Sequence, residues 1–199
     1  MPRPVTTAFD TPTREAVTPL LRGRFGREYL YISECASTQR LLEPGAPEGA
    51  VVVTDFQAEG RGRLGRRWDA PPGTSLLLSL QLWPVVEGER LPELSLVAGR
   101  AVADAIEAAA PVRTSIRFPN DVLIRERKVA GILAEATDGR VVLGIGINVN
   151  VAPEALPGDV RTPATSLLAE TGRETDRRTL LVALLDHLER GYDSWNRRK

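Results

Sequence analysis

Residues 128–150 read KVAGILAEATDGRVVLGIGINVN, and this stretch predicts the strand pairing on which the fold depends. An Asp-Gly step at residues 138–139 separates two apolar runs rich in valine, isoleucine and leucine. Asp-Gly between such runs is a strong signal for a two-residue hairpin, because both residues accept the left-handed backbone that the turn needs. We therefore expect strands over residues 128–136 and 140–150 that pair antiparallel.

The second strand of this hairpin has one face without apolar side chains. Side chains alternate between the two faces of a strand, so this face carries Gly144, Gly146, Asn148 and Asn150. A face made of glycines weakens a strand and often marks a place where a ligand approaches the backbone closely. A bulged or edge strand is the alternative, and the consistent phase of the glycines disfavours it.

The rest of the chain adds strands and a few helices around the hairpin. Expected strands lie at residues 29–33, 50–55, 75–83, 114–118 and 121–125. Expected helices lie at residues 13–22, at residues 92–110 and after Asp176. Hairpins beside a few long amphipathic helices predict an α+β fold, with a mixed, mostly antiparallel sheet and helices on one side. Regular βαβ alternation is missing, so a doubly wound parallel sheet is disfavoured.

Length and composition exclude several classes of protein. The chain has 199 residues, 26 basic and 26 acidic side chains, one cysteine and one histidine. The length suits one domain over residues 1–199, in which residues 1–27 form an arm and a short helix, and residues 1–14, rich in proline and threonine, are expected to be a loose arm. Zero net charge argues against duplex DNA or an anionic membrane as partner. One cysteine excludes an intramolecular disulfide, and one histidine argues against a zinc site built from several histidine or cysteine ligands. The sequence contains no visible signal peptide or membrane-spanning run, so we expect a cytoplasmic protein.

Residues 57–68 read QAEGRGRLGRRW and concentrate arginine and glycine. Glycines let the backbone turn tightly near a ligand, and guanidinium groups donate forked hydrogen bonds to phosphate or carboxylate oxygens. The glycines also match the spacing G-x-G-x-x-G, but Trp-Asp-Ala-Pro-Pro-Gly follows where a dinucleotide-binding fold needs a helix. We therefore interpret the segment as an anion-binding loop. A disordered basic loop and a short RNA-binding patch are the alternatives.

A second polar cluster surrounds the one lysine inside the chain. Of the 26 basic residues only two are lysine, Lys128 and the C-terminal Lys199. A compact ammonium differs from a planar guanidinium, so position 128 is a candidate for a specific role. The expected hairpin brings Lys128 near Asn120 and Asp121, a set suited to holding a metal–phosphate and a carboxylate together. An ordinary hairpin with polar turn residues is the alternative.

A third polar segment, Ser37-Thr38-Gln39, precedes an apolar run and predicts a helix start. Ser37 is the expected N-cap, because a serine hydroxyl can accept a hydrogen bond from a free backbone N–H of the first turn. A helix N-terminus is also a natural anion site.

In this order, the segments resemble the catalytic domain of biotin protein ligases. The family signatures are an Ala-Ser-Thr-Asn turn, a Gln-x-x-Gly-Arg-Gly-Arg-x-Gly-Arg-x-Trp loop, a Lys-Trp-Pro-Asn-Asp turn, a Lys-x-x-Gly-Ile-Leu strand and a Gly-x-Gly-Ile-Asn strand. They match residues 36–39, 57–68, 117–121, 128–133 and 144–148, and residues 164–167 match a further family segment. The resemblance spans roughly residues 28–196. It implies the fold shared by class II aminoacyl-tRNA synthetases and biotin ligases.

The resemblance implies a two-step reaction that uses ATP, Mg²⁺ and biotin. The biotin carboxylate attacks the α-phosphate of Mg-ATP and gives biotinyl-5′-adenylate and pyrophosphate. The ε-amine of a lysine on a biotin carboxyl carrier protein domain of a biotin-dependent carboxylase, such as acetyl-CoA carboxylase, then attacks the mixed anhydride. Mg²⁺ is expected to bind through the phosphates, with Asp121 as its candidate protein ligand. A homodimer is compatible with the family, and no DNA or membrane partner is expected.

The resemblance also implies roles for individual residues. Those expected to bind biotin are Ser37, Thr38, Gln39, Gln57, Gly60, Arg61, Gly62, Arg63, Lys128, Gly131, Ile132 and Gly144. Those expected to bind ATP and the adenylate are Arg63, Arg66, Trp68, Asn120, Asp121, Lys128 and Asn148. The expected catalytic residues are Lys128, Arg63, Arg66 and Asp121. Residues 61–63 should fold over both ligands, and Trp68 should pack near the adenine.

Some features depart from the family pattern. Gln39 stands where the family prefers Asn, and Arg117-Phe118 replaces Lys-Trp. We expect neither a winged-helix domain before the first strand nor a small β domain after the last helix, and hence no operator binding. Two other interpretations stay open, a lipoate or octanoate ligase or transferase of the same fold, and a biotin- or RNA-binding module without catalysis.

Overall fold

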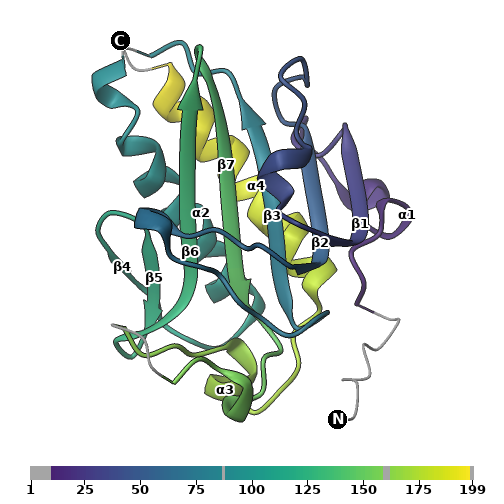
Figure 1. Ribbon diagram of the computed structural model, residues 1–199, viewed down its shortest axis with the longest axis vertical. Coiled ribbons are helices and arrows are strands. Elements are labelled where there is room, and N and C mark those ends of the chain that lie inside the picture. Colours follow the sequence, from purple (N-terminus) through teal and green to yellow (C-terminus); the bar gives the residue numbers. More distant parts are fainter. Residues whose placement is uncertain (1–9, 87, 159–161, 198–199) are drawn as a thin grey trace.

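The computed structural model describes residues 10–86, 88–158 and 162–197, which form a seven-stranded sheet with helices (Figure 1). The strands in chain order are β1 (Tyr29–Cys35), β2 (Val51–Gln57), β3 (Ser75–Leu82), β4 (Ser115–Arg117), β5 (Asp121–Ile124), β6 (Arg127–Thr137) and β7 (Arg140–Asn148). In space they follow the order β1-β2-β3-β7-β6-β5-β4. β1 and β2 run parallel, and all other neighbours run antiparallel. The prediction of a mixed, mostly antiparallel sheet is confirmed.

The hairpin of β6 and β7 forms the centre of this sheet. β6 and β7 pair up to Thr137 and Arg140, and the turn residues Asp138 and Gly139 have φ of 52° and 77°. Positive φ at both turn residues matches the twist of the flanking strands, which explains the choice of Asp-Gly. On its other side β7 pairs with β3.

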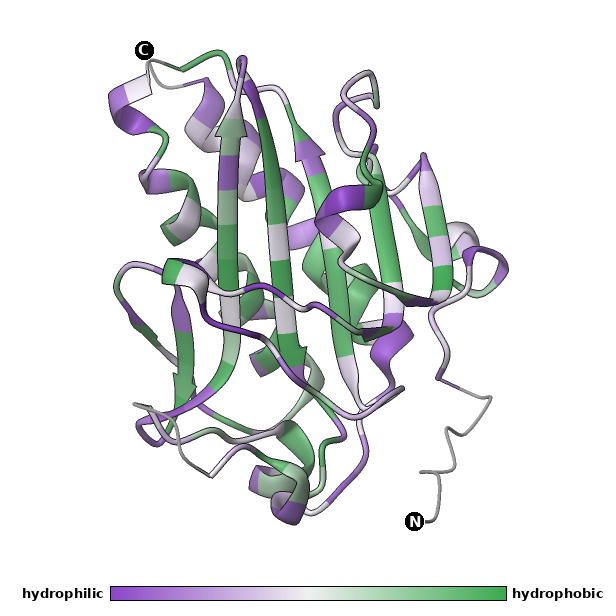
Figure 2. Cartoon of the chain, in the orientation of Figure 1, coloured by the Kyte–Doolittle hydropathy of each residue, from purple (hydrophilic) through white to green (hydrophobic). Residues whose placement is uncertain are grey.

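Two long helices, α2 (Glu93–Ala109) and α4 (Arg177–Asn196), cover one face of the sheet (Figure 1). They pack against each other, α2 also contacts β4, β5 and β6, and α4 contacts β3. The strand side chains beneath them are buried and apolar, among them Leu76, Leu78, Leu80, Leu82, Ile145 and Ile147. Figure 2 shows mainly hydrophobic positions along the central strands. Each large side chain buried here stabilises the fold by about 1.5–3 kcal/mol.

Shorter elements complete the described chain. They are α1 (Arg14–Val17), α3 (Leu167–Thr171) and single 3-10 turns at Thr18–Leu20, Thr38–Leu41, Arg63–Gly65, Gly88–Arg90 and Pro153–Ala155. Within the described ranges, no helix combines the length and the hydropathy that a membrane crossing requires.

Ser37 does not act as the helix cap that we expected. Only one 3-10 turn, Thr38–Leu41, follows it, and its hydroxyl accepts no capping hydrogen bond. The physical reason is that the turn is a tight 3-10 turn, in which the backbone N–H of Arg40 donates to the main-chain carbonyl of Ser37 at 3.1 Å instead of to its hydroxyl. The prediction of a turn at this point is correct, but the prediction of the cap is wrong.

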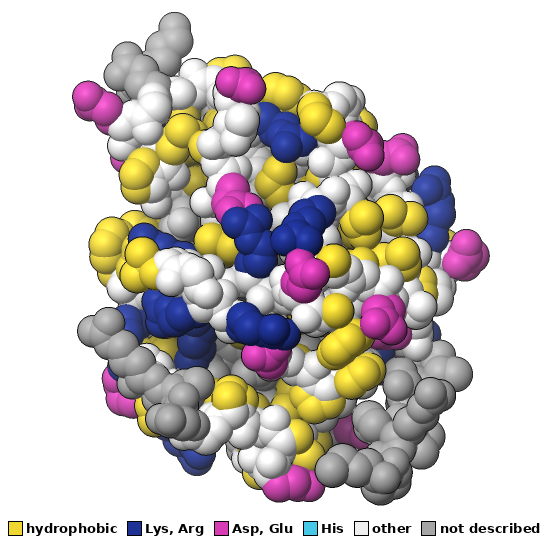
Figure 3. Space-filling view, viewed as in Figure 1, with side chains coloured by type: hydrophobic (Ala, Val, Ile, Leu, Met, Phe, Trp, Pro, Cys, Tyr) yellow, Lys and Arg dark blue, Asp and Glu magenta, His cyan; other side chains and the backbone are white. Residues whose placement is uncertain are grey.

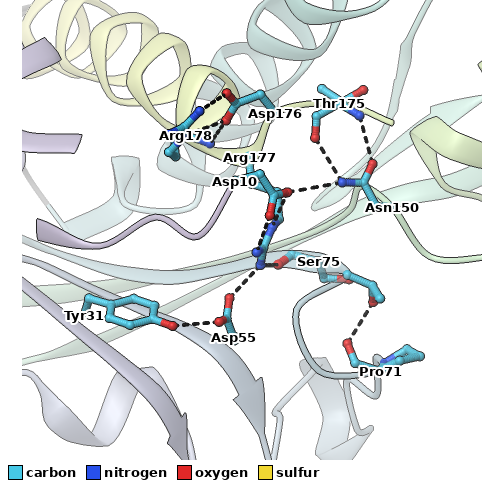
Figure 4. Close-up of polar contacts among 11 residues, drawn as sticks. Asp10, Tyr31, Asp55, Pro71, Ser75, Asn150, Thr175, Asp176, Arg177 and Arg178 are labelled. Carbon is cyan, nitrogen blue, oxygen red and sulfur yellow. Dashed lines mark hydrogen bonds and ion pairs between the residues drawn. The ribbon is translucent and has the colours of Figure 1, made fainter. Parts of the chain in front are cut away.

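A buried charge network links the segment at Asp10 and the start of α4 to strand β2 of the sheet (Figure 4). Arg177, the first residue of α4, is fully buried and pairs with Asp10 at 2.8 Å and with Asp55 at 2.6 Å. Asp55 also accepts a hydrogen bond from the hydroxyl of Tyr31, and Asp10 from the amide of Asn150. Burial opposes the charge of Arg177, but the bonds and charges of both carboxylates outweigh it and raise the pKa of Arg177.

This network corrects two expectations. Residues 1–9 lie outside the described residues, but residues 10–14 are not the loose arm that the sequence predicted, because Asp10 is buried and Thr13 caps α1. Asn150 does not belong to the glycine face, because β7 ends at Asn148 and the Asn150 amide turns to Asp10 and Thr175.

Candidate active site

A cavity of about 400 Å³ lies on the sheet face opposite α2 and α4. The segment between β2 and β3 crosses in front of this face (Figure 1), and we call its residues 58–69 the arginine loop. Figure 3 views the molecule from this side and shows Lys and Arg side chains gathered over the middle of the face, with acidic side chains among them. The cavity is therefore enclosed between a sheet and a basic loop.

Glycines form the floor of the cavity. Gly131 of β6 pairs with Gly146 of β7, and Gly144 is the next residue of β7 on the same face. A Cβ on Gly146 would lie 2.6 Å from the ring of Trp68, and one on Gly131 would lie 2.9 Å from it. A Cβ on Gly144 would lie 3.2 Å from the amide carbon of Gln39. Only glycine allows these two side chains to lie on the strands.

The arginine loop closes on itself at its base. The backbone N–H of Trp68 donates to the carbonyl of Gly60 at 2.9 Å, and that of Gly62 donates to Arg66 at 2.7 Å. A Cβ on Gly60 would lie 2.1 Å from the carbonyl oxygen of Trp68, so this position requires glycine. Gly60 does not line the cavity. Its place at the base of the loop indicates that it shapes the loop instead of touching a ligand.

The arginines of the loop extend in different directions. Arg61 makes a forked pair with Glu135 of β6, at 2.9 and 2.7 Å. Arg63 reaches the turn between β4 and β5, where it donates to Oδ1 of Asn120 at 3.3 Å. The side chain of Arg66 donates back to the carbonyl of Arg63. The loop is thus attached to the sheet at two points, and the guanidinium groups of Arg63 and Arg66 pair with no carboxylate in the described chain.

One end of the cavity carries neutral hydrogen-bonding groups. Oε1 of Gln57 accepts from the backbone N–H and the hydroxyl of Thr38, at 2.8 and 3.1 Å. The Thr38 hydroxyl also lies 2.7 Å from the hydroxyl of Ser79. Gln39 donates to the carbonyl of Leu133 at 3.4 Å. With its oxygen occupied, the Gln57 amide presents its nitrogen as a donor, beside hydroxyls that can donate or accept.

The other end carries the charged groups around Lys128. Its ammonium lies 2.7 Å from Oδ1 of Asp121 and 5.5 Å from the centroid of the Trp68 ring. The backbone around it is held on both sides, because its N–H donates to Pro163 and its carbonyl accepts from Thr165. Thr165 in turn accepts from the side-chain amide of Asn148 at 3.0 Å.

The Trp68 ring covers the glycine floor without a partner for its polar atom. Its Nε1 is buried and makes no hydrogen bond. A buried donor without a partner costs about 1–3 kcal/mol. The ring position in this structure therefore leaves the hydrogen-bonding capacity of the indole N–H unused. We expect the ring to move or to gain a partner when a ligand enters.

The structure brings together almost every residue that the sequence singled out. The cavity lining includes Ser37, Thr38, Gln39, Gln57, Arg61, Gly62, Arg63, Arg66, Trp68, Asn120, Asp121, Lys128, Gly131, Ile132, Gly144 and Asn148. Gly60 is the exception. Sequence reasoning did not name Ser79, which lines the cavity, or Glu135, which pairs with Arg61 of the loop. Ser79 could have been found, because it interrupts an apolar strand in the phase that faces Gly144.

No group of three or more histidine, cysteine, aspartate or glutamate side chains that could hold a metal occurs among the described residues. Near the charged end of the cavity, the carboxylate of Asp121 is available to a hard cation, and Oδ1 of the neighbouring Asn120 accepts a hydrogen bond from Arg63. Magnesium commonly binds to one or two carboxylates together with substrate phosphates. The residues present therefore fit a magnesium ion that arrives with a nucleotide.

Comparison with known proteins identifies relatives for this arrangement. Residues 32–152 match the model of the biotin/lipoate A/B protein ligase family. The chain is 39% identical to the bifunctional ligase/repressor BirA of Bacillus subtilis, over 84% of this chain and 54% of that protein. It is 41% identical to the biotin–[acetyl-CoA-carboxylase] ligase of Mycobacterium tuberculosis, over 74% of this chain and 56% of that protein. The chain thus spans about half the length of these curated relatives.

A solved structure has the same fold. It is a biotin protein ligase from Aquifex aeolicus in complex with biotin and ATP, with a TM-score of 0.78 and 35% sequence identity. The likeness covers 87% of this chain and 73% of that one. The α+β fold expected from the sequence is therefore the catalytic fold of that group of enzymes.

Proposed function

The chain belongs to the biotin/lipoate A/B protein ligase family, and on this premise we propose that it is an ATP-dependent biotin protein ligase. It activates biotin as biotinyl-5′-adenylate and then transfers the biotinyl group to a protein lysine. The relatives named as biotin ligases and the relative that binds biotin and ATP support this proposal.

The single observation that favours biotin over lipoate is the polar end of the cavity. Biotin has a ureido ring with two N–H donors and a carbonyl acceptor, whereas the dithiolane ring of lipoate has no such groups. At this end, the Thr38 hydroxyl lies within hydrogen-bond distance of both Gln57 and Ser79. Against a dithiolane the donor nitrogen of the Gln57 amide would lose water without gaining a partner, at a cost of about 1–3 kcal/mol.

In the first step, a carboxylate oxygen of biotin attacks the α-phosphorus of ATP. The new P–O bond forms as the bond to pyrophosphate breaks, and pyrophosphate leaves with the electron pair. Lys128 lies between the polar end and the Asn120–Asp121 turn, so its ammonium holds the carboxylate and stabilises the charge that grows on the α-phosphate. Arg63 and Arg66, which pair with no carboxylate within the described ranges, neutralise the remaining phosphate charge.

In the second step, the lysine ε-amine attacks the acyl carbon of the adenylate. The C–N bond of the amide forms, the C–O bond to the phosphate breaks, AMP leaves, and the amine releases a proton. The acceptor is a biotin carboxyl carrier protein domain of a biotin-dependent carboxylase. Two relatives named as biotin–[acetyl-CoA-carboxylase] ligases support this class of acceptor.

A magnesium ion would arrive bound to the ATP phosphates. Asp121, with Asn120 beside it, would hold the ion there, and its charge would support the departure of pyrophosphate. Asp121 also faces Lys128, whose ammonium lies 2.7 Å from its Oδ1. The Asp121 carboxylate orients the Lys128 side chain and can still bind a cation through an oxygen on the phosphate side.

The test is pyrophosphate release by the purified chain with Mg-ATP and either biotin or lipoate. We expect release with biotin only, followed by biotinylation of an added carrier domain. Release of pyrophosphate with lipoate only would show that lipoate, and not biotin, is the substrate. Binding of biotin without release at saturating ATP would contradict catalysis, and binding of RNA alone would contradict the proposal as a whole.

A further inference from the structure

Two large apolar side chains are strongly exposed beside the mouth of the cavity. Leu64, at the tip of the arginine loop, is 88% exposed, and Phe118, in the turn before β5, is 71% exposed. Neither lines the cavity. Figure 3 shows hydrophobic side chains at this edge of the face, next to Lys and Arg side chains. We call Leu64 and Phe118 the apolar rim.

A hydrogen bond joins the two segments that carry the apolar rim. Arg63, the neighbour of Leu64, donates to the side chain of Asn120 in the same turn as Phe118, at 3.3 Å. Asn120 donates in turn to the carbonyl of Ile132 on β6 at 3.0 Å. The loop tip and the turn therefore form one edge of the mouth, next to Asp121 and Lys128.

The backbone holds Leu64 in an unfavourable conformation. Its φ of 58° and ψ of 39° are left-handed, and Gly65 follows with φ of 72°. Leucine rarely adopts this conformation, and such strain concentrates at functional sites. Because the loop is closed at its base by Gly60 and Trp68, the tip presents Leu64 to solvent instead of folding it inward.

The surroundings of the apolar rim are positively charged. Among the residues that the structure describes, Arg63 and Arg66 have no carboxylate partner, and the Arg117 guanidinium is balanced by Glu126 at 2.9 Å. A bound adenylate would cancel only part of the remaining charge. A partner that covers the apolar rim must therefore offer an apolar spot with acidic side chains around it.

We propose that the apolar rim is the docking surface for the folded acceptor domain, whose target lysine enters the cavity beside Lys128. This inference rests on the proposed function, because it assumes that a protein lysine attacks the adenylate. A lysine side chain has only four methylene groups, so the surface of its domain must sit directly on the mouth. Leu64 and Phe118 are the apolar groups available there, and the neighbouring arginines favour an acidic domain surface.

The test separates docking from chemistry by using two nucleophiles on the same adenylate. Leu64→Asn removes the apolar side chain and keeps a residue that tolerates the left-handed backbone, and Phe118→Ser removes the ring. In the double variant, kcat/KM for transfer to a biotin carboxyl carrier domain should fall about 10-fold, or about 1.4 kcal/mol. Discharge of the adenylate by hydroxylamine, which needs no docking surface, should stay within about twofold.

A matched control is Val85→Ser, because Val85 is 82% exposed but lies near the end of α4, where its N–H donates to Asn196. This variant should transfer biotin normally. Added salt should slow transfer to the carrier domain and leave hydroxylamine discharge unchanged.

Normal transfer by the double variant would overturn the inference while leaving the proposed function intact. Equal slowing with both nucleophiles would also overturn it, because the side chains would then act on the chemistry. Absence of pyrophosphate release by the unmodified chain would instead contradict the proposed function itself.

Discussion

The ammonium of Lys128 occupies a space that a guanidinium does not fit. It lies 2.7 Å from Asp121, and its Nζ is 3.0 Å from the point where a Cβ on Gly131 would be. The Trp68 ring, whose centroid lies 5.5 Å from Nζ of Lys128, bounds the same space. A planar fork is larger and demands a fixed geometry. This crowding gives a physical reason for a lysine in a chain that otherwise uses arginine.

Replacing Lys128 tests this reasoning at the level of one residue. We expect Lys128→Ala to slow adenylate formation by about 10²–10³-fold, because the positioned charge on the α-phosphate is lost. Lys128→Arg should restore less than a tenth of the lost rate, because the fork cannot take the position of the ammonium. Pyrophosphate release measures both variants, and thermal unfolding checks that the fold survives. Near-normal release by either variant would remove Lys128 from the mechanism.

Single residues also show where sequence reasoning succeeds and where it stops. Lys128 and Asn120 could be predicted, because unusual composition and turn chemistry are visible locally. The role of Gly60 could not, because its 2.1 Å approach to the Trp68 carbonyl depends on how the loop closes. Ser37 failed as a cap because only a short 3-10 turn follows it, in which the N–H of Arg40 donates to the Ser37 carbonyl, and the length of that turn is not visible in the local sequence.

At the scale of elements, the arginine loop behaves as a small hairpin with a fixed base. Gly60→Ala should open it, because the new methyl group would collide with backbone that cannot rotate away. We expect the adenylate to dissociate about 10-fold faster, a loss of about 1.4 kcal/mol of binding. Stopped-flow dissociation of the pre-formed adenylate measures this rate.

The matched control for the loop is Gly45→Ala. A Cβ at Gly45 would meet no atom within 4 Å, and Gly45 has no positive φ. Its adenylate dissociation rate should equal that of the unmodified chain. An unchanged rate in Gly60→Ala would show that the base of the loop does not control release.

Element prediction succeeded where one local signal decides the structure. The Asp-Gly turn and the apolar stripes predict β6, β7, α2 and α4 to within a few residues. The parallel pairing of β1 with β2 was not predicted, because nothing within either strand specifies its neighbour. Pairing between distant segments is determined by the packing of the whole sheet.

For the whole molecule, the buried side chain of Arg177 joins distant parts of the chain. It binds Asp10 and Asp55, which belong to the N-terminal segment and to β2. Arg177→Met should lower the free energy of unfolding by about 3–5 kcal/mol, because it leaves two buried carboxylates without a counter-charge. Urea denaturation measures the loss.

A second substitution separates lost charge from lost packing. Asp55→Asn in the Arg177→Met background removes one uncompensated charge, and the amide oxygen still accepts from Tyr31. We expect this double variant to be more stable than Arg177→Met alone. Equal or lower stability would show that packing, and not the unpaired charge, accounts for the loss.

Acid should destabilise the whole molecule through carboxylates on its helices. A hydrogen bond from Arg178 lowers the pKa of Asp176, one from Arg24 lowers the pKa of Asp193, and the backbone N–H of Thr114 lowers the pKa of Glu107. A carboxyl whose pKa is lower in the folded state stabilises the fold above its unfolded pKa, and loses that effect as pH falls through the folded value.

The free energy of unfolding should therefore be level between about pH 7 and 5 and should fall below about pH 4.5, near the ordinary values of Asp and Glu. Urea denaturation at a series of pH values measures this dependence. Asp193→Asn removes one of the three carboxyls, so this variant should be less stable at pH 7 and should lose less stability in acid. If Asp193→Asn loses stability in acid as steeply as the unmodified chain, Asp193 does not contribute to the acid dependence. The loss of stability would then come from Asp176 and Glu107.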